Sequence, residues 1–376
     1  MAQLRTGIRC VLLLCLLAVA ACGQPQPSAS PPTPHPPPTT GPIASAGGDT
    51  QADLSAIKTY LLDQVATLKQ HTAALKEASD RYYDLARGTN FDYARLWSER
   101  PDEVREVMEA ARAAWIAASP GYERIEGIVA GVPTLANYDL ILDAGSSAEE
   151  DPENAVPFDL TLPDGRVLPK PGNLFGVTES ALWGTFAEYT ATGIQPDLNG
   201  NGKTDFGDAL PDANVLKAAS EALDRYTAEL ATAAQSWQPS ESDAFTALVV
   251  MIPTMSEYFA SWKNSRFVAG EASTQRDFVA ISRLADIQDI LSGLQVVYVG
   301  ISPLASSVDP AQDQQIKEGL SNLKSFVADV YAQEQSGKRF TPEEADLLGA
   351  EAQARATAIA GQITQVAARL NVPIQE

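Results

Sequence analysis

The chain has 376 residues, of which 48 are acidic and 27 basic, and its formal charge is −21. Proteins bind nucleic acid through basic patches, so this balance excludes a nucleic-acid partner. The three cysteines, Cys10, Cys15 and Cys22, all lie in the first 22 residues. The rest of the chain therefore has no thiol for a disulfide, a thiolate metal site or a nucleophile.

The N-terminus has the layout of a signal peptide. Arg5 and Arg9 precede an apolar run over 11–21, about half the ~20 residues that a spanning helix needs. Small residues then lead to Cys22, which resembles a lipobox, in which the cysteine is acylated and becomes the new N-terminus. We predict a signal peptide over 1–21 and lipidation at Cys22, which anchors the protein to the outer side of a bacterial cytoplasmic membrane. The alternative is an ordinary signal peptide with an accidental cysteine.

A tether follows Cys22. Residues 22–52 are rich in Pro, Ser and Thr, a composition that favours extended polyproline conformations and cannot bury a core. Removal of Arg5 and Arg9 with the signal peptide changes the formal charge from −21 to −23. We expect residues 53–376 to fold, and we expect no segment after the signal peptide to be apolar enough to span a membrane.

The folded region is dominated by apolar residues at helical spacing. The main stripes are Leu54, Ile57, Leu61, Val65, Leu68 and Leu75; Leu284, Ile287, Leu291, Leu294 and Tyr298; Leu320, Leu323, Val327 and Val330; and Ile359, Ile363, Val366 and Leu370. Helix starts are expected at Pro101 and, after the N-cap Thr341, at Pro342. These patterns predict an all-α fold of helical bundles. If there are two bundles, 53–145 and 173–376, the boundary is the acidic, proline-rich stretch 146–172.

Two insertions interrupt the helices. Residues 160–168 predict a small β-hairpin around the turn Asp164-Gly165. Residues 197–208 fit the EF-hand calcium loop, in which oxygens at alternate positions converge on one ion around a central glycine. Its predicted ligands are Asp197, Asn199, Asn201, Lys203 through its carbonyl, Asp205, and Asp208 in place of the usual glutamate. We expect a structural calcium ion here; the alternative is a polar, turn-rich insertion.

Three segments in order resemble the imelysin family, which includes the EfeO and EfeM components of bacterial iron uptake. They are Tyr122–Glu126 (YERIE), Phe175–Trp183 (FGVTESALW, against the family's HxxExxLW) and Ser282–Gly293 followed by Tyr298. The resemblance covers most of 53–372. It implies two helical bundles with a metal site between them, iron as a ligand and a permease or other uptake partner.

The resemblance implies that Glu123, Glu126 and Glu179 bind the metal, because the family places such acids together. The family's histidine is missing, since Gly176 stands in its position. Carboxylates alone suit hard cations such as ferric iron or calcium. Alternatively, Glu123 and Glu126 pair with Arg124 or solvent, and Glu179 forms hydrogen bonds within the bundle. Along the later helix, Arg283, Asp286 and Asp289 are expected to be an ordinary polar face, and Trp183, Tyr258 and Trp262 to be core.

Imelysins are also classed as metallopeptidases, so the resemblance implies peptidase activity as an alternative. The residues of the folded region argue against catalysis. The folded region has one histidine, His71, no cysteine and no HExxH motif. His71 lies at the edge of an apolar stripe and is expected to be a boundary or surface residue. We therefore expect a non-enzymatic protein that binds a metal ion or a metal-bearing ligand. The alternatives are an interaction scaffold that has lost the metal site and, least supported, a peptidase.

Overall fold

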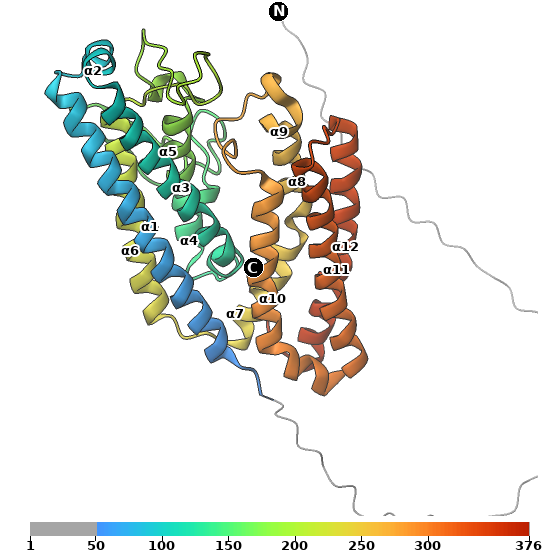
Figure 1. The fold of residues 1–376 in the computed structure, drawn as a ribbon. Helices are drawn as coiled ribbons and strands as arrows, with labels where there is room; N and C mark the ends of the chain where they lie inside the picture. Colours follow the sequence, from blue (N-terminus) through green and yellow to red (C-terminus); the bar gives the residue numbers. More distant parts are fainter. Residues whose placement is uncertain (1–50, 376) are drawn as a thin grey trace, which may run out of the picture. The chain divides into compact units, whose positions relative to one another are not determined.

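The computed structural model describes residues 51–375, which belong to one compact unit (Figure 1). Helices account for nearly all of its regular structure, as the sequence predicts. The predicted signal peptide, the predicted lipidation site Cys22 and almost all of the predicted tether lie outside the described residues.

The first group of helices comes from the N-terminal half of the described chain. Long helix α1 packs against α3 and α6 (Figure 1), and short helix α5 packs against α6 and α3. The elements of this group are α1 (Leu54–Gly88), α2 (Tyr93–Glu99), α3 (Pro101–Val129), α4 (Ala136–Asp139), the π-helix η1 (Leu140–Ala144), α5 (Leu174–Trp183), the 3-10 turn η2 (Ala187–Tyr189) and α6 (Ala213–Ser236).

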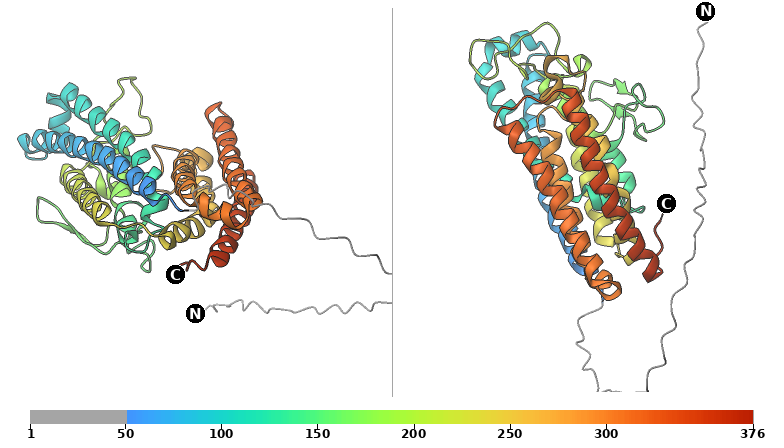
Figure 2. Two further views of the ribbon diagram at one scale, coloured as in Figure 1. Left: turned by 90° about the horizontal axis from the view of Figure 1, so that it is seen from below. Right: turned by 90° about the vertical axis from the view of Figure 1, so that its right-hand side faces the viewer.

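The second group follows along the chain. Helix α10 packs against α7, α8 and α11, and α12 covers α7, α8 and α11 from the other side (Figures 1 and 2). Its elements are α7 (Glu241–Met251), the 3-10 turn η3 (Ile252–Thr254), α8 (Met255–Asn264), α9 (Arg266–Ala269), the 3-10 turn η4 (Gly270–Ala272), α10 (Arg283–Val308), α11 (Pro310–Gln335) and α12 (Pro342–Leu370).

The division between the groups differs from the boundary proposed at 146–172. Helices α5 and α6 come after that stretch, yet they pack on α3 and α1. The boundary between the two helix groups lies after α6, near Trp237, because α6 packs on α1 and α5 whereas α7 packs on α12 and α10. The reason is that 146–172 is a loop whose two ends are paired, with Ser147 bridged to Pro171. It therefore connects η1 and α5, which are neighbours within the first group.

Local signals place the helix ends. Pro101 begins α3 as expected, and Thr341 caps α12 in a capping box in which its hydroxyl accepts from the Glu344 N–H while the Glu344 carboxylate accepts from the Thr341 N–H. Helices α7 and α8 are separate, because Pro253 leaves the helical conformation between them.

The predicted hairpin is present. Strands β1 (Leu160–Thr161) and β2 (Val167–Leu168) pair antiparallel, with Leu160 opposite Leu168. Gly165 has φ +90°, a left-handed conformation that glycine adopts without a Cβ penalty, and this is what the Asp-Gly turn predicts.

Two segments are long and apolar enough to cross a membrane, contrary to the expectation from sequence. They are Glu241–Asn264 and Arg283–Val308, and in each more than half of the most apolar window is buried inside the protein. Both lie in the second helix group, where their apolar residues pack against α12 and α11. Their composition is accounted for by this core position.

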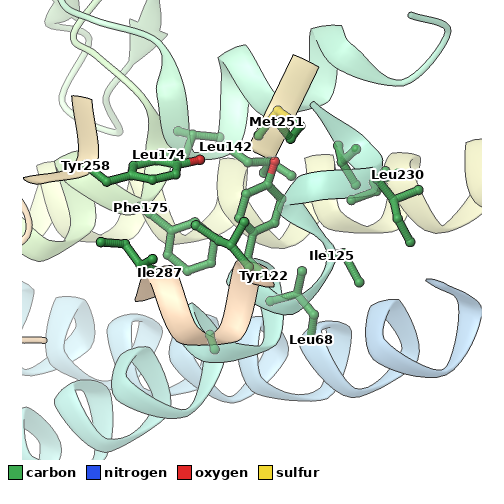
Figure 3. Close-up of a cluster of buried hydrophobic side chains, with 14 of the residues drawn as sticks. Leu68, Tyr122, Ile125, Leu142, Leu174, Phe175, Leu230, Met251, Tyr258 and Ile287 are labelled. Atoms are coloured by element: carbon green, nitrogen blue, oxygen red, sulfur yellow. The ribbon is translucent and has the colours of Figure 1, made fainter. Parts of the chain in front are cut away.

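Apolar side chains from both groups meet in one core. Tyr122 and Phe175, from α3 and α5, lie with ring centres 5.7 Å apart, and Ile287 of α10 is buried in the same core. Figure 3 shows these side chains with Tyr258 of α8 and Leu142 of η1 beside them. Helices α3 and α10 join the two groups directly.

Candidate metal centre

Three buried carboxylates approach one another where α3 meets η1. Oxygens of Glu123, Glu126 and Asp143 all lie within 4.8 Å of one another, and each side chain is less than a tenth exposed. Glu123 and Glu126 are three residues apart on α3 and so share a face. Asp143 is carried by the π-helix η1, an irregularity that is frequent at functional sites.

Only one of the two carboxylate oxygens of Glu126 has a hydrogen-bond partner among the described residues. Its Oε1 accepts a 2.6 Å hydrogen bond from the hydroxyl of Tyr258, whereas its buried Oε2 has no hydrogen-bond partner among the described residues. A buried acceptor without a partner costs about 1–3 kcal/mol, and more when it is charged. This oxygen is therefore open to a ligand that supplies positive charge.

Arg283, the first residue of α10, lies against the same cluster. Its guanidinium is 3.1 Å from Glu123, 3.4 Å from Asp286 and 3.9 Å from Asp143. The guanidinium also faces the rings of Tyr258 and Phe278, at 4.6 and 4.2 Å. Arg283 and Asp286 were expected to be part of an ordinary polar face of an amphipathic helix. Instead both are buried, at 5% and 3% exposed, because this face of α10 packs against α3.

Acidic groups outnumber the guanidinium that faces them. Burial raises the pKa of Glu123 and of Asp143 well above the usual range, and the positive charge of Arg283 only partly offsets this. Burial also raises the pKa of Asp286 to about 6 and that of Asp139 to about 7. The cluster therefore holds negative charge that protons or a cation must neutralise.

Glu179 lies next to this cluster and not in it. Its carboxylate accepts three backbone hydrogen bonds, from the N–H groups of Phe278 (2.7 Å), Val279 (2.9 Å) and Ala280 (2.8 Å). Burial raises the pKa of Glu179 to about 8, against the effect of these donors. The sequence left open whether Glu179 binds metal or forms hydrogen bonds within the bundle, and in this structure its oxygens are engaged by the backbone.

Gly176 occupies the position of the family's histidine, and the space for a side chain there is taken. A Cβ at this residue would lie 3.0 Å from Asn173 Oδ1 and 3.0 Å from Asp277 Oδ2. Asn173 is fixed because it caps α5 through the N–H of Gly176, at 2.6 Å. A histidine would therefore require Asp277 to move.

A cavity of about 680 Å³ opens onto Glu126, Asp143 and Arg283. Its wall carries further acids, Asp139, Glu150, Glu257 and Asp277, and one further base, Arg276. Arg276 pairs with Glu150 at 3.1 Å. The cavity as a whole is acidic, and it is far larger than one metal ion requires.

The predicted calcium loop has an ordered set of internal hydrogen bonds. Asp197 accepts from the N–H groups of Asn201 and Gly202, at 3.0 and 2.8 Å, and Asp208 accepts from those of Leu198 and Asp205, at 3.0 and 2.8 Å. Gly200 and Gly202 have positive φ values, as tight turns require.

The acidic side chains of the loop are more widely spaced than those of the buried cluster. In the described part of the chain, Asp197, Asp205 and Asp208 do not form a group of carboxylates as close as Glu123, Glu126 and Asp143. Asn199, Asn201 and Lys203, the other predicted ligands, are exposed.

The remaining residues that the sequence singled out lie mostly outside the cavity, and two acids near it were not predicted. His71 is partly exposed on α1 and does not line the acidic cavity. Tyr258 and Trp262 are buried as expected, and Trp183 is partly buried. Sequence reasoning missed Asp143 and Asp139, which lie in a segment with no motif. Their one signal is the pair of acids four residues apart, which a helix places on one face.

Comparison with known proteins agrees with the fold. Among curated proteins, none matches this sequence. A solved structure from Parabacteroides distasonis, of a protein described as an iron-regulated protein A precursor, has 15% sequence identity and a TM-score of 0.50, and the similarity covers 85% of this chain and 97% of that chain. The family model of the imelysins, peptidase family M75, matches residues 55–370. This match spans most of the chain, so the protein belongs to the imelysin family.

Proposed function

We propose that this protein is an extracytoplasmic imelysin-type binding protein that holds a hard metal cation at Glu123, Glu126 and Asp143 without catalysing a reaction. The observation that carries the proposal is the buried Oε2 of Glu126, which has no hydrogen-bond partner in the described chain and lies beside two further buried carboxylates. Oxygens within 4.8 Å of one another suit an ion that binds each at about 2.0–2.5 Å.

The donor chemistry selects the class of ion. Carboxylate oxygens suit hard cations, and ferric iron and calcium are the leading candidates. Membership of the imelysin family and the description of the Parabacteroides protein as iron-regulated both favour iron. Because acids predominate around the cavity, a free or hydrated cation fits it better than a negatively charged metal chelate.

A binding role fits the residues better than catalysis. The one histidine in the described part of the chain, His71, does not line the cavity, and no HExxH motif is present in the sequence. A second candidate is an interaction scaffold that has lost the family's metal site, which the replacement of the histidine by Gly176 favours. A metallopeptidase is the least supported alternative.

Anchoring and partners form part of the same proposal. Lipidation at Cys22 and the proline-rich tether would hold the domain outside the cytoplasmic membrane, where it could pass a metal to a permease or other uptake partner. The support for this part is the order of signal-peptide layout, cysteine and tether in the sequence.

Ferric titration of the purified domain, with iron delivered as its nitrilotriacetate complex, tests the metal site. We expect one ion per chain in the wild type and at least ten-fold weaker binding in Glu126→Gln, which keeps the shape of the side chain and removes its charge. Glu257→Gln is the matched control, because Glu257 is an exposed acid on the cavity wall. Wild-type binding that Glu126→Gln leaves unchanged would place the ion elsewhere, and no binding at all would favour the scaffold.

We also propose a structural calcium ion at 197–208. An ion there would neutralise Asp197, Asp205 and Asp208, with Asn199, Asn201 and the carbonyl of Lys203 as further ligands. The shorter Asp208 makes bidentate closure harder, so the dissociation constant is expected near the 10⁻⁴–10⁻³ M range of extracellular modules. Calorimetric calcium titration of the wild type, Asp197→Ala and Asp208→Ala checks it. A melting temperature that millimolar calcium leaves unchanged would mean that the loop is only a polar insertion.

A further inference from the structure

We propose that Arg283 is a built-in competitor of the metal: its guanidinium occupies the carboxylates in the metal-free protein and must leave them when a cation binds. The proposal rests on the metal site proposed above. It adds a residue that sets the affinity of that site and makes the bound ion releasable.

The competition follows from shared partners. Glu123 and Asp143 belong to the close group of carboxylates, and the same two side chains face the Arg283 guanidinium at 3.1 and 3.9 Å. The third member, Glu126, is the one that Arg283 does not pair with, and its Oε2 has no hydrogen-bond partner among the described residues. Arg283 thus donates hydrogen bonds to Glu123, lies within ion-pair distance of Asp143 and leaves Glu126 Oε2 open for the first contact with an ion.

The two positive charges cannot share these oxygens at low cost. A cation bound to Glu123 and Asp143 would lie within about 4–5 Å of the guanidinium, where two unit charges repel by about 4 kcal/mol at an effective dielectric constant of 20. The repulsion grows with the charge of the ion. Movement of the guanidinium away from the carboxylates relieves it.

Arg283 has the means to move. Its Nε is buried without a hydrogen-bond partner in the described chain, so the side chain is held mainly by the carboxylates and by the rings of Tyr258 and Phe278. The residue also lines the cavity of about 680 Å³, which gives the guanidinium space to enter. The rings of Tyr258 and Phe278 can still hold the guanidinium through cation–π contacts after it leaves the carboxylates.

The test compares two substitutions by titration with gallium(III), a diamagnetic trivalent ion, delivered as its nitrilotriacetate complex. Arg283→Gln removes the competing charge, and we expect it to bind gallium at least ten-fold more tightly than the wild type. Arg283→Lys keeps the charge and should stay within a few-fold of the wild type. Glu126→Gln, measured in parallel, should bind gallium at least ten-fold more weakly than the wild type, which assigns the titrated ion to the cluster.

The outcomes separate this inference from the metal site itself. Equal affinity in the wild type and Arg283→Gln overturns the competition and leaves the site standing. Binding in Arg283→Gln alone supports the competition in its strongest form, whereas binding in no variant contradicts the metal site and the competition together.

If Arg283→Gln does not fold, nitrogen-15 NMR of arginine side chains in the wild-type protein decides. The Nε–H signal that Arg283→Lys lacks should shift when gallium is added. A signal that stays in place at saturating gallium would show that the guanidinium has not moved, and so overturn the competition.

Discussion

Glu179 holds the turn that places Phe278 against Arg283. Phe278 has φ +53°, a left-handed conformation that is costly for a residue with a side chain, and the Glu179 carboxylate accepts from its N–H and from the next two. In this structure, Glu179 acts on the site through the backbone of 278–280, because it positions the Phe278 ring over the Arg283 guanidinium.

Replacement of Glu179 by glutamine is expected to destabilise the protein. The amide NH₂ of glutamine has no lone pair, so at least one backbone donor is left without an acceptor, at a cost of about 1–3 kcal/mol in the free energy of unfolding. Urea denaturation measures it. Glu257→Gln, on the exposed cavity wall, should change stability by less than about 0.5 kcal/mol. Equal stability of the two variants would mean that the carboxylate does not hold the turn.

Asp139 makes stability depend on pH. Burial, followed by the charge of Glu126, raises its pKa to about 7, whereas an unfolded chain has an aspartate pKa of about 3.9. The folded protein binds the proton more tightly, so the free energy of unfolding is expected to fall as pH rises from about 4 to about 7.

Asp139→Asn removes this titration and keeps the carbonyl oxygen that accepts from Tyr122 at 2.7 Å. Thermal unfolding at pH 5 and pH 8, without added metal, should show a smaller loss of stability in this variant than in the wild type, by on the order of 1 kcal/mol. An identical pH slope in the two proteins would show that Asp139 does not titrate in this range.

At the scale of elements, the close approach of α3 and α10 brings the acids and the arginine together. Helix α3 carries Glu123 and Glu126, and α10 carries Arg283 and Asp286. A Cβ at Gly293 of α10 would lie 2.1 Å from the Arg124 carbonyl oxygen of α3, so only glycine permits this spacing.

Gly293→Ala is therefore expected to push the helices apart and to destabilise the protein by on the order of 1–3 kcal/mol. Gly361→Ala on α12 is the matched control, because a Cβ there meets nothing within 4 Å. There the greater helix propensity of alanine should stabilise by up to about 1 kcal/mol. Denaturation curves with the same direction of change in both variants would contradict the close approach.

Helices were predictable from sequence, and their mutual arrangement was not. The stripe from Ile57 to Leu75 is buried as its spacing indicates, since periodicity defines which face of a helix is apolar. Periodicity does not show whether the polar face meets water or another polar face. For this reason Arg283 and Asp286 were expected only as an ordinary polar face, and the place of α6 beside α1 was missed.

The candidate site was predictable in part. Glu123 and Glu126 came from the imelysin resemblance, and both lie in the buried cluster. Asp143 could not be predicted, because it lies in a π-helix, which has no recognisable sequence pattern. The prediction of a calcium loop at 197–208 depends on local residue spacing alone, so it could be made without knowledge of the fold.

At the scale of the whole molecule, the charge of the chain and its proposed anchor support the same role. An acidic domain outside the membrane concentrates cations around it, and the acidic cavity extends this attraction to the buried cluster. Release of the ion then requires a competing charge, which Arg283 would supply.

Lipid anchoring is tested by Cys22→Ala in a host that processes lipoproteins. The variant should remain unprocessed or appear in the soluble fraction, because the thiol that carries the lipid is gone. Mass spectrometry and membrane fractionation check this. A variant that stays in the membrane fraction with the mature mass of the wild type would rule out lipidation at Cys22.

The most direct measurement of the central claim is a crystal structure of the domain soaked with iron, with anomalous diffraction recorded at the iron edge. We expect one strong anomalous peak about 2.0–2.5 Å from oxygens of Glu123, Glu126 and Asp143, with the Arg283 guanidinium turned away from it. A peak only at 197–208, or no peak while the carboxylates remain paired with Arg283, would contradict a metal centre at this cluster.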